Sequence, residues 1–287
     1  MGNNVKTAVL LAGMTAFVIL VGQLIGGQRG AVMALILAGA MNFFSYFFSD
    51  KIAIMSSGAQ PIAREDAPRL YEIVERLTAK ANLPMPKLFM IPTDSPNAFA
   101  TGRNPQHASV AVTAGILKLL TDDELEGVLA HELGHVRNRD ILISSVAATL
   151  AGAITLIARM AYYGELFGGF GGRDRERDGG GIISALAMMI LAPIAALLIQ
   201  MAVSRSREFQ ADATGAHFTG NPYALASALR KIEEWSQRIP MAASPATAHL
   251  YISMPRLGMS FGNLFSTHPP TAERIARLTG MGMQQTF

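Results

Sequence analysis

The segment His131-Glu132-Leu133-Gly134-His135 places two histidines four residues apart, with a glutamate beside the first. Positions four apart lie on the same face of an α-helix, so both imidazoles can reach one metal ion. The carboxylate of Glu132 then lies next to that ion, where it can accept a proton from a bound water. This arrangement is typical of zinc-dependent proteases, and it predicts His131 and His135 as metal ligands and Glu132 as the general base.

A catalytic zinc ion takes three protein ligands and keeps one position open, so the two histidines are an incomplete set. One arrangement adds a glycine three residues after the second histidine and a third histidine six residues after it. This chain has Asn138 at the glycine position and Ile141 at the histidine position. Another takes a glutamate from a second helix, with an aspartate one turn later that orients a ligating histidine. That E-x-x-x-D spacing occurs once in the chain and indicates Glu208 as third ligand and Asp212 as orienting residue. His268 and Asp212 are the alternatives for the third ligand.

The local sequence gives the histidine-bearing helix a defined start. Thr121 and Glu124 match a capping box, in which each side chain accepts a hydrogen bond from the backbone N–H of the other residue. Apolar residues then recur on one side of the helix as far as the first histidine. The two histidines are therefore expected on a capped, half-buried helix.

The rest of the polar sequence alternates between helical and extended patterns, which predicts a mainly α fold with a small β-sheet. The elements that we expect are a helix over 67–81, strands over 87–91 and 109–113 with a short extended piece from residue 97 between them, a helix over 221–235, a loop over 236–267, and a last helix over 271–278.

Four apolar blocks account for the low content of charged residues, which is 16% of the chain, against roughly 25% in soluble domains. Each block is close to the roughly 20 residues that a helix needs to cross a membrane, and none has a charge near its middle. An alternative for the first block is a signal peptide, and for the last two it is packing within the protein without crossing. We expect four transmembrane helices, over 7–27, 31–48, 141–163 and 182–203.

If all four blocks cross the membrane, most of the basic residues that flank them lie on the same side of it. Because an excess of Lys and Arg marks cytoplasmic segments, both termini and both metal-binding segments are expected in the cytoplasm. The basic residues are Lys6, Lys51, Arg137, Arg139, Arg205 and Arg207. The expected organisation is a transmembrane hairpin over 1–50, a catalytic part over 51–140, a second hairpin over 141–203 with a Gly-rich loop at 164–181, and a second catalytic part over 204–287.

Composition excludes several other kinds of site. The chain of 287 residues has no cysteine, which rules out disulfides, a cysteine nucleophile and cysteine-ligated zinc. Its net charge of +3 is too small and too scattered to indicate a nucleic-acid partner. The expected partners are the lipid bilayer and polypeptide or membrane-protein substrates.

Four segments together resemble a known family: NAFATG, HELGH, SRSREFQAD and THPPTAERI, set among four hydrophobic blocks. They are similar to the HtpX-type heat-shock membrane metalloproteases of bacteria, which are gluzincins related to the CAAX prenyl endopeptidases. The resemblance extends over nearly the full chain. It implies a zinc endopeptidase of the bacterial inner membrane, with a cytoplasmic catalytic domain, that helps to degrade misfolded membrane proteins under stress.

The resemblance also implies roles for particular residues. It makes His131, His135 and Glu208 the ligands of one zinc ion (Zn²⁺) per chain, and Glu132 the catalytic base. It further implies that the NAFA segment, which begins at Asn97, is a strand edge that pairs with the substrate backbone.

The substrate side of the site has three further candidates. Asn97 and Ala98 are expected to bind the substrate backbone, since both lie in the NAFA segment. The oxyanion of the tetrahedral intermediate needs a donor besides zinc, for which His268 is the first candidate and Arg274 the second. The alternative for His268 is a turn histidine held by the two prolines that follow it.

Two other functions fit parts of the sequence. The same enzyme could process a specific peptide or a lipidated tail. A non-catalytic membrane scaffold or transporter could bind zinc structurally, but such a site has no need for the base at Glu132, and transporters tend to carry ionisable residues at mid-membrane, which these blocks lack.

Overall fold

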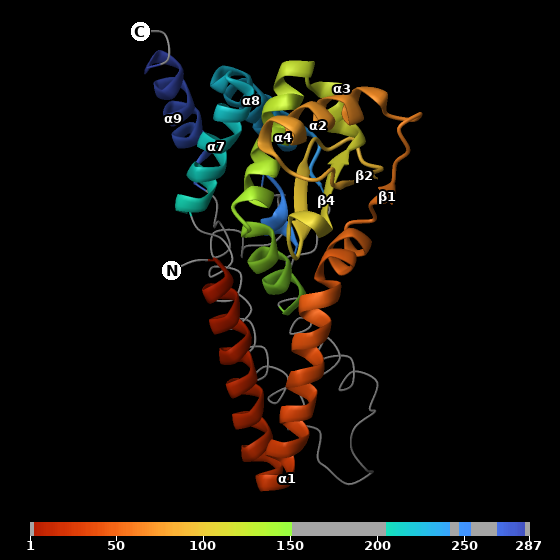
Figure 1. Ribbon diagram of the computed structural model, residues 1–287, viewed down its shortest axis with the longest axis vertical. Coiled ribbons are helices and arrows are strands. Elements are labelled where there is room, and N and C mark those ends of the chain that lie inside the picture. Colours follow the sequence, from red (N-terminus) through yellow and green to blue (C-terminus); the bar gives the residue numbers. More distant parts are fainter. Residues whose placement is uncertain (1–2, 151–204, 242–246, 254–268, 285–287) are drawn as a thin grey trace.

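A computed structural model describes residues 3–150, 205–241, 247–253 and 269–284 (Figure 1). A long helical hairpin extends away from a body in which helices surround a small sheet. The predicted mainly α fold with a small sheet is confirmed. Residues 151–204, which contain most of the third predicted span and all of the fourth, lie outside the described residues, so the four-span arrangement stays a prediction.

The hairpin is α1 (Asn3–Ser56), whose two antiparallel arms are seen in Figure 1. The arms meet near Gly27, which has a φ of +56° that breaks the helical path. Between them, Asn42 donates a side-chain hydrogen bond of 2.8 Å to Thr15. The first two predicted spans lie on these arms, and the second arm continues past the expected end of its span to Ser56.

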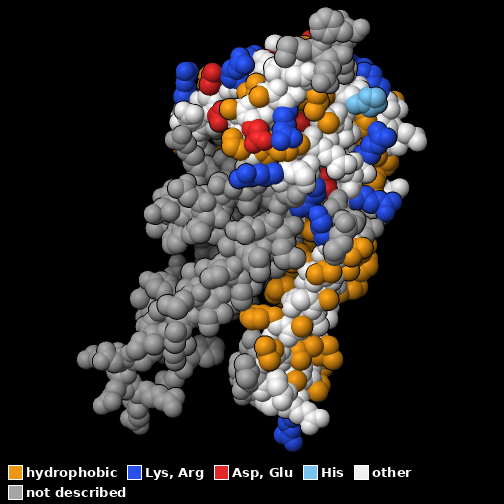
Figure 2. Space-filling model, turned by 90° about the vertical axis from the view of Figure 1, so that its left-hand side faces the viewer, with side chains coloured by type: hydrophobic (Ala, Val, Ile, Leu, Met, Phe, Trp, Pro, Cys, Tyr) orange, Lys and Arg blue, Asp and Glu red, His pale blue; other side chains and the backbone are white. Residues whose placement is uncertain are grey.

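The second arm is apolar and exposed. Among the described residues, Gly27–Ser56 is the one helix long and apolar enough to cross a membrane, while Val5–Leu20 and Asp140–Leu150 are shorter apolar helices. Ile36 and Leu37 of the second arm are 64% and 63% exposed. Figure 2 shows hydrophobic side chains gathered along this extension, with charged side chains on the body and at the far tip of the extension. A surface of this kind is stable against another apolar phase rather than against water.

The body contains a four-stranded mixed sheet. Its order is β1-β2-β4-β3, with β2 and β4 parallel and the other neighbours antiparallel. The strands are β1 (Gln60–Pro61), β2 (Lys87–Ile91), β3 (Ala98–Gly102) and β4 (Ala108–Thr113). The two predicted strands and the extended piece are confirmed. The pair of residues in β1 is too short to leave a pattern in the sequence.

The helices of the body agree with the expected ones, with longer ends. The helix expected to end at residue 235 runs three residues further, and the helix expected to end at residue 278 runs six residues further. One short helix, α3, was not predicted. The helices are α2 (Pro68–Ala81), α3 (Ala114–Leu119), α4 (Asp122–Arg137), α7 (Arg205–Thr219), α8 (Pro222–Arg238) and α9 (Thr271–Gln284), with single 3₁₀ turns η1 (Pro105–His107) and η2 (Ala248–Leu250).

Helix α4 lies at the centre of the body. It contacts α2, α7, α8 and β3, and most of its residues are buried. The predicted capping box is present, since Glu124 accepts a hydrogen bond from the backbone N–H of Thr121 and donates one through its own N–H to the Thr121 hydroxyl. The Glu124 carboxylate also accepts a bond of 2.8 Å from Lys231, which ties the start of α4 to α8. A helix held on all sides fixes the direction of the side chains that it carries.

Two glycines let α7 approach α4 closely. A Cβ on Gly215 would lie 2.8 Å from the backbone nitrogen of His131, and a Cβ on Gly134 would lie 3.2 Å from the carbonyl oxygen of Ala211. No larger residue fits at Gly215 without moving backbone, because the neighbouring atoms belong to the main chain. The spacing of the two helices therefore depends on Gly215.

We predict that Gly215→Ala lowers the free energy of unfolding by about 1–3 kcal/mol, because the added methyl group overpacks the α4–α7 contact. Thermal unfolding of the purified protein in detergent, followed by circular dichroism, measures the change. The matched control is Gly280→Ala in α9, where an added Cβ meets nothing within 4 Å. That variant should be neutral or slightly more stable. Equal destabilisation by both changes would show that the close contact is not the cause.

Candidate metal centre

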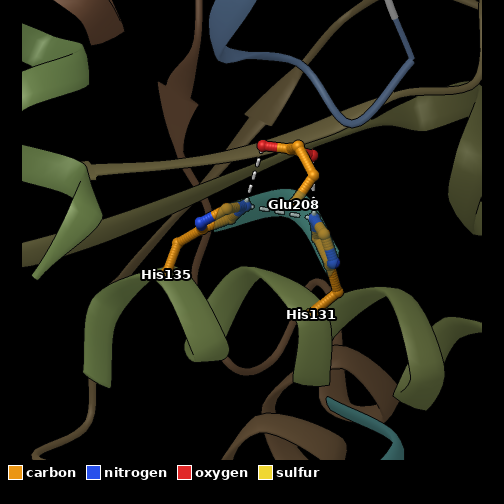
Figure 3. Close-up of side chains that lie close together, drawn as sticks. All are labelled: His131, His135 and Glu208. Atoms are coloured by element: carbon orange, nitrogen blue, oxygen red, sulfur yellow. Dashed lines mark hydrogen bonds and ion pairs between the residues drawn. The ribbon is translucent and has the colours of Figure 1, made fainter. Parts of the chain in front are cut away.

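Three side chains from two helices converge beside the sheet (Figure 3). His131 and His135 extend from α4, and Glu208 extends from the first turn of α7. Their ligand atoms all lie within 4.8 Å of one another. The two Nε2 atoms are 3.2 Å apart, and the Glu208 oxygens lie 3.5 Å from His135 Nε2 and 3.8 Å from His131 Nε2. The three predicted ligands therefore meet at one position.

The spacing of these atoms suits a small tetrahedral cation. Zinc binds nitrogen and oxygen at about 2.0–2.2 Å in a tetrahedron, which separates neighbouring ligand atoms by about 3.3–3.6 Å. Two of the three separations lie within about 0.1 Å of that range and the third is slightly longer. Because all three are possible ligands and none is a cysteine, the donor set also matches the two-histidine, one-glutamate type of catalytic zinc site.

The charges around the position also suit a divalent cation. Four buried carboxylates are accompanied by two buried guanidinium groups. With both histidines neutral, as metal binding requires, and all four carboxylates ionised, the described residues near the site have a formal excess of two negative charges. A buried charge is costly unless it is compensated, and a doubly charged cation compensates this excess. The carboxylates are Glu132, Asp140, Glu208 and Asp212, and the guanidiniums are Arg207 and Arg274.

Each histidine has a carboxylate on its other ring nitrogen. The Nδ1 atom of His131 lies 2.9 Å from Asp212 Oδ1, and that of His135 lies 3.1 Å from Asp140 Oδ2. A proton held on Nδ1 leaves the Nε2 lone pair free to bind a metal. Asp212 thus occupies the place that the E-x-x-x-D spacing predicts for it. Asp140 was not predicted, because no helical spacing relates it to His135.

Arg274 is buried and binds Asp212. Its Nε and Nη2 atoms donate to the two oxygens of Asp212 at 2.9 and 2.7 Å, and Nη1 donates to the Ile252 carbonyl at 3.2 Å. Burial alone would raise the pKa of Asp212, but Arg274 and His131 outweigh it and hold that pKa well below its usual range. The expected contact of Arg274 with substrate is therefore revised: its geometry fits a residue that holds Asp212 and His131, with Nη2 3.3 Å from His131 Nδ1.

Glu132 is buried beside the cluster, at 2% exposure. Burial raises its pKa to about 7, and the neighbouring Glu208 adds to the shift, while His135 and a hydrogen bond from the Ala100 backbone oppose it. A base acts best when its pKa lies near the working pH. The environment of Glu132 therefore suits a group that takes up and releases a proton near neutrality.

The two histidines respond differently to burial. Burial lowers the pKa of His131, and the nearby Arg274 lowers it further. Burial also acts against protonation of His135, but Glu208 and Asp140 outweigh it and raise that pKa to about 9. Both rings must be neutral to bind a metal, so their carboxylate partners matter as orienting groups as well as charges.

The outer edge of β3 is already occupied at its start. The Ala98 carbonyl accepts a hydrogen bond of 2.9 Å from the Ile252 N–H. The Asn97 amide donates to the Ser253 carbonyl at 2.7 Å and accepts from the Ser253 N–H at 3.3 Å. Asn97 and Ala98 thus hold the segment 251–253 in this structure, and the prediction that they face substrate is revised. His268, the first oxyanion candidate, lies outside the described residues.

The fold and the site together define a class of protein: a metal-dependent hydrolase whose two-histidine, one-glutamate cluster and buried glutamate base lie between a central helix and a mixed sheet. Residues 64–282 match the model of Peptidase family M48, and the chain belongs to this family. The chain is a metalloprotease, as the resemblance to the HtpX-type enzymes implied.

Similar curated proteins cover nearly all of the chain. It is 58% identical to a protease HtpX homolog of Desulfatibacillum aliphaticivorans, over 98% of this chain and 90% of the relative. It is 55% identical to a protease HtpX homolog of Syntrophobacter fumaroxidans, over 98% of this chain and all of the relative. Among solved structures, it is similar in fold to the crystal structure of S. mikatae Ste24p, with a TM-score of 0.52 and 20% identity over 96% of this chain; the chain spans 65% of that protein.

We predict that Arg274→Ala lowers the free energy of unfolding by about 3–5 kcal/mol, because it removes the cation that compensates the buried carboxylate of Asp212. Thermal unfolding of the purified protein compares it with the parent. Arg230→Ala, at an exposed position of α8, is the matched control and should change stability by less than about 0.5 kcal/mol. A stable Arg274→Ala protein with reduced turnover would instead favour the contact with substrate that the sequence predicted.

Proposed function

We propose that this metalloprotease is a zinc-dependent membrane endopeptidase that hydrolyses peptide bonds in misfolded or damaged membrane proteins. The observation that carries the proposal is the convergence of His131, His135 and Glu208, with Glu132 buried beside them, in a chain of Peptidase family M48. Two imidazoles and a carboxylate at these distances favour zinc over magnesium or calcium, which prefer oxygen ligands alone.

The chain's own residues provide the proton transfers of hydrolysis. When bound, zinc lowers the pKa of a water molecule toward roughly 7 and polarises the scissile carbonyl. Glu132 would accept a proton from the attacking water and deliver it to the leaving amine. Asp212 and Arg274 keep His131 in place during these steps. We retain His268 as the donor to the oxyanion, on the sequence argument alone.

Glu132 also separates this proposal from a structural zinc site in a membrane scaffold. A structural site takes four protein ligands and needs no base. Here, among the described residues, three ligand groups converge, and the carboxylate next to them has a pKa raised to about 7 by burial. This arrangement supports hydrolysis over a scaffold function.

The exposed apolar hairpin supports a place in the membrane. We propose that the two arms of α1 cross the bilayer, with the blocks at 141–163 and 182–203 as two further spans. At the body end of the second arm, Lys51 lies over the Phe48 ring at 5.3 Å and Arg103 lies over the Phe47 ring at 5.4 Å. Lys and Arg side chains at the end of an apolar helix keep their charged groups in water while their stems cover apolar surface. The body, and with it the metal centre, would then lie just outside the bilayer, on the cytoplasmic side of a bacterial inner membrane.

This placement reconciles water chemistry with a membrane. Asp140, five residues after His135, begins the apolar helical segment Asp140–Leu150, and Glu208 lies near the start of α7, soon after the fourth block. The site is thus tied to the ends of the proposed spans. In this placement the site would lie outside the hydrocarbon, where water is available for hydrolysis, and close enough to lipid to receive polypeptides that leave the membrane.

Glu132→Gln tests the base directly. We expect this variant to bind zinc like the parent protein and to lose at least two orders of magnitude in kcat, because an amide keeps the shape but cannot accept the proton. Zinc content by atomic absorption and cleavage of an unfolded membrane protein are the two measurements. Glu126→Gln, the same change elsewhere on α4, should leave both unchanged. Near-parental turnover in Glu132→Gln would eliminate this mechanism.

The proposed topology predicts which positions are reachable from outside the cell. Since the chain has no cysteine, a single introduced thiol reports its own location. A membrane-impermeant thiol reagent added to intact cells should label Gly171→Cys, in the Gly-rich loop, and should label Gln60→Cys only after lysis. Labelling of both positions only after lysis would show that the third and fourth blocks do not cross the membrane.

A further inference from the structure

Asp140 lies against the second metal-binding histidine. It is 3% exposed, and its Oδ2 atom is 3.1 Å from Nδ1 of His135. It is also the first residue of the apolar helical segment Asp140–Leu150. A carboxylate buried at this depth needs a polar partner, and His135 provides one.

The backbone between the two residues is shaped to make this contact. Helix α4 ends at Arg137, and the N–H groups of Asn138 and Arg139 close it by donating to the carbonyls of Gly134 and Val136. Arg139 then adopts a φ of +58°. A non-glycine residue in this left-handed region is unfavourable and persists where its surroundings require it, often at functional sites. The turn at Arg139 allows the Asp140 carboxylate to reach back to His135.

The contact places the metal-binding nitrogen of His135. With its Nδ1 proton donated to Asp140, the ring presents Nε2, which lies 3.2 Å from His131 Nε2 and 3.5 Å from Glu208 Oε1. Without that contact the ring could rotate or adopt the other tautomer, because His135 is more exposed than His131. Asp212 makes the equivalent contact for His131, so each ligating histidine has its own carboxylate.

We propose that Asp140 is a positioning residue that fixes the tautomer and direction of His135 for metal binding. The inference rests on the proposed function, since it assumes that His135 is a ligand. Asp140 comes from the helical segment that continues into the third apolar block, whereas Asp212 comes from α7. The geometry of the metal centre therefore depends on where that apolar segment begins.

A simpler role for Asp140 is to stabilise the start of its own helix, since a negative charge is favourable at a helix N-terminus. The two roles predict different results. A helix-start role predicts a lower unfolding temperature of the metal-free protein and unchanged metal affinity. A positioning role predicts a loss of metal affinity even in a variant that folds normally.

The test measures zinc affinity of the full chain in detergent, by competition with a chromophoric chelator. Asp140→Asn removes the charge and keeps the shape, and we expect it to weaken zinc binding about 10- to 100-fold, as for other groups that orient metal ligands. The visible spectrum of the cobalt-substituted protein should change, because it reports ligand geometry. Turnover should fall through kcat, with KM little changed. Asp123→Asn, the same change in the exposed first turn of α4, is the control and should behave like the parent.

A second variant covers the case in which Asp140→Asn does not fold. Asp140→Ser keeps a small polar residue at the first position of the helix, but its side chain is too short to reach His135. It too should lose zinc affinity while its metal-free unfolding temperature stays near that of the parent. Parental zinc affinity and an unchanged cobalt spectrum in whichever variant folds would overturn the positioning role. A parent protein that binds no zinc would instead overturn the proposed function.

Discussion

The close contact between α4 and α7 is the constraint on which the rest of the site depends. Two of the three ligands come from one helix and the third from the other, so the cluster exists only at one helix separation. That separation is set by backbone against backbone at Gly215, where a Cβ would lie 2.8 Å from the His131 nitrogen. A rigid, buried α4 then acts as the reference for every other contact: the sheet on one side, α2 and α8 around it, and Glu208 across the glycine contact.

Charge compensation is the second constraint. A buried carboxylate is unfavourable unless it has a polar or charged partner. The carboxylates around this site differ in their partners and therefore in what they do. Asp212 is paired with Arg274 and His131, and Asp140 contacts His135, so both keep a ligand in place. At Glu132 burial outweighs the neighbouring groups that favour the carboxylate and raises its pKa to about 7, which suits proton transfer. A difference in partners thus gives similar carboxyl groups different functions.

The apolar segments of the chain are connected to the metal centre. The hairpin of α1 exposes apolar side chains that water does not favour, and the segment that begins at Asp140 continues from the metal-binding helix into another apolar block. The elements that would hold the protein in lipid are therefore continuous with those that build the site. The chemistry does not require the bilayer, but in the proposed topology the position of the site relative to the bilayer would decide which polypeptides can reach it.

The sequence by itself determined the local parts of this protein. The four-residue spacings of His131 with His135 and of Glu208 with Asp212, the capping box at Thr121, and the strands with clear β-rich runs all follow from short-range periodicity. Only the tertiary structure decided that Arg274 faces Asp212, that Ala98 pairs with Ile252, and that Asp140 reaches His135. The first two contacts join segments that are far apart in the chain, and the third crosses a left-handed turn at Arg139. No repeating pattern encodes such contacts, because they depend on how the helices and the sheet pack around α4.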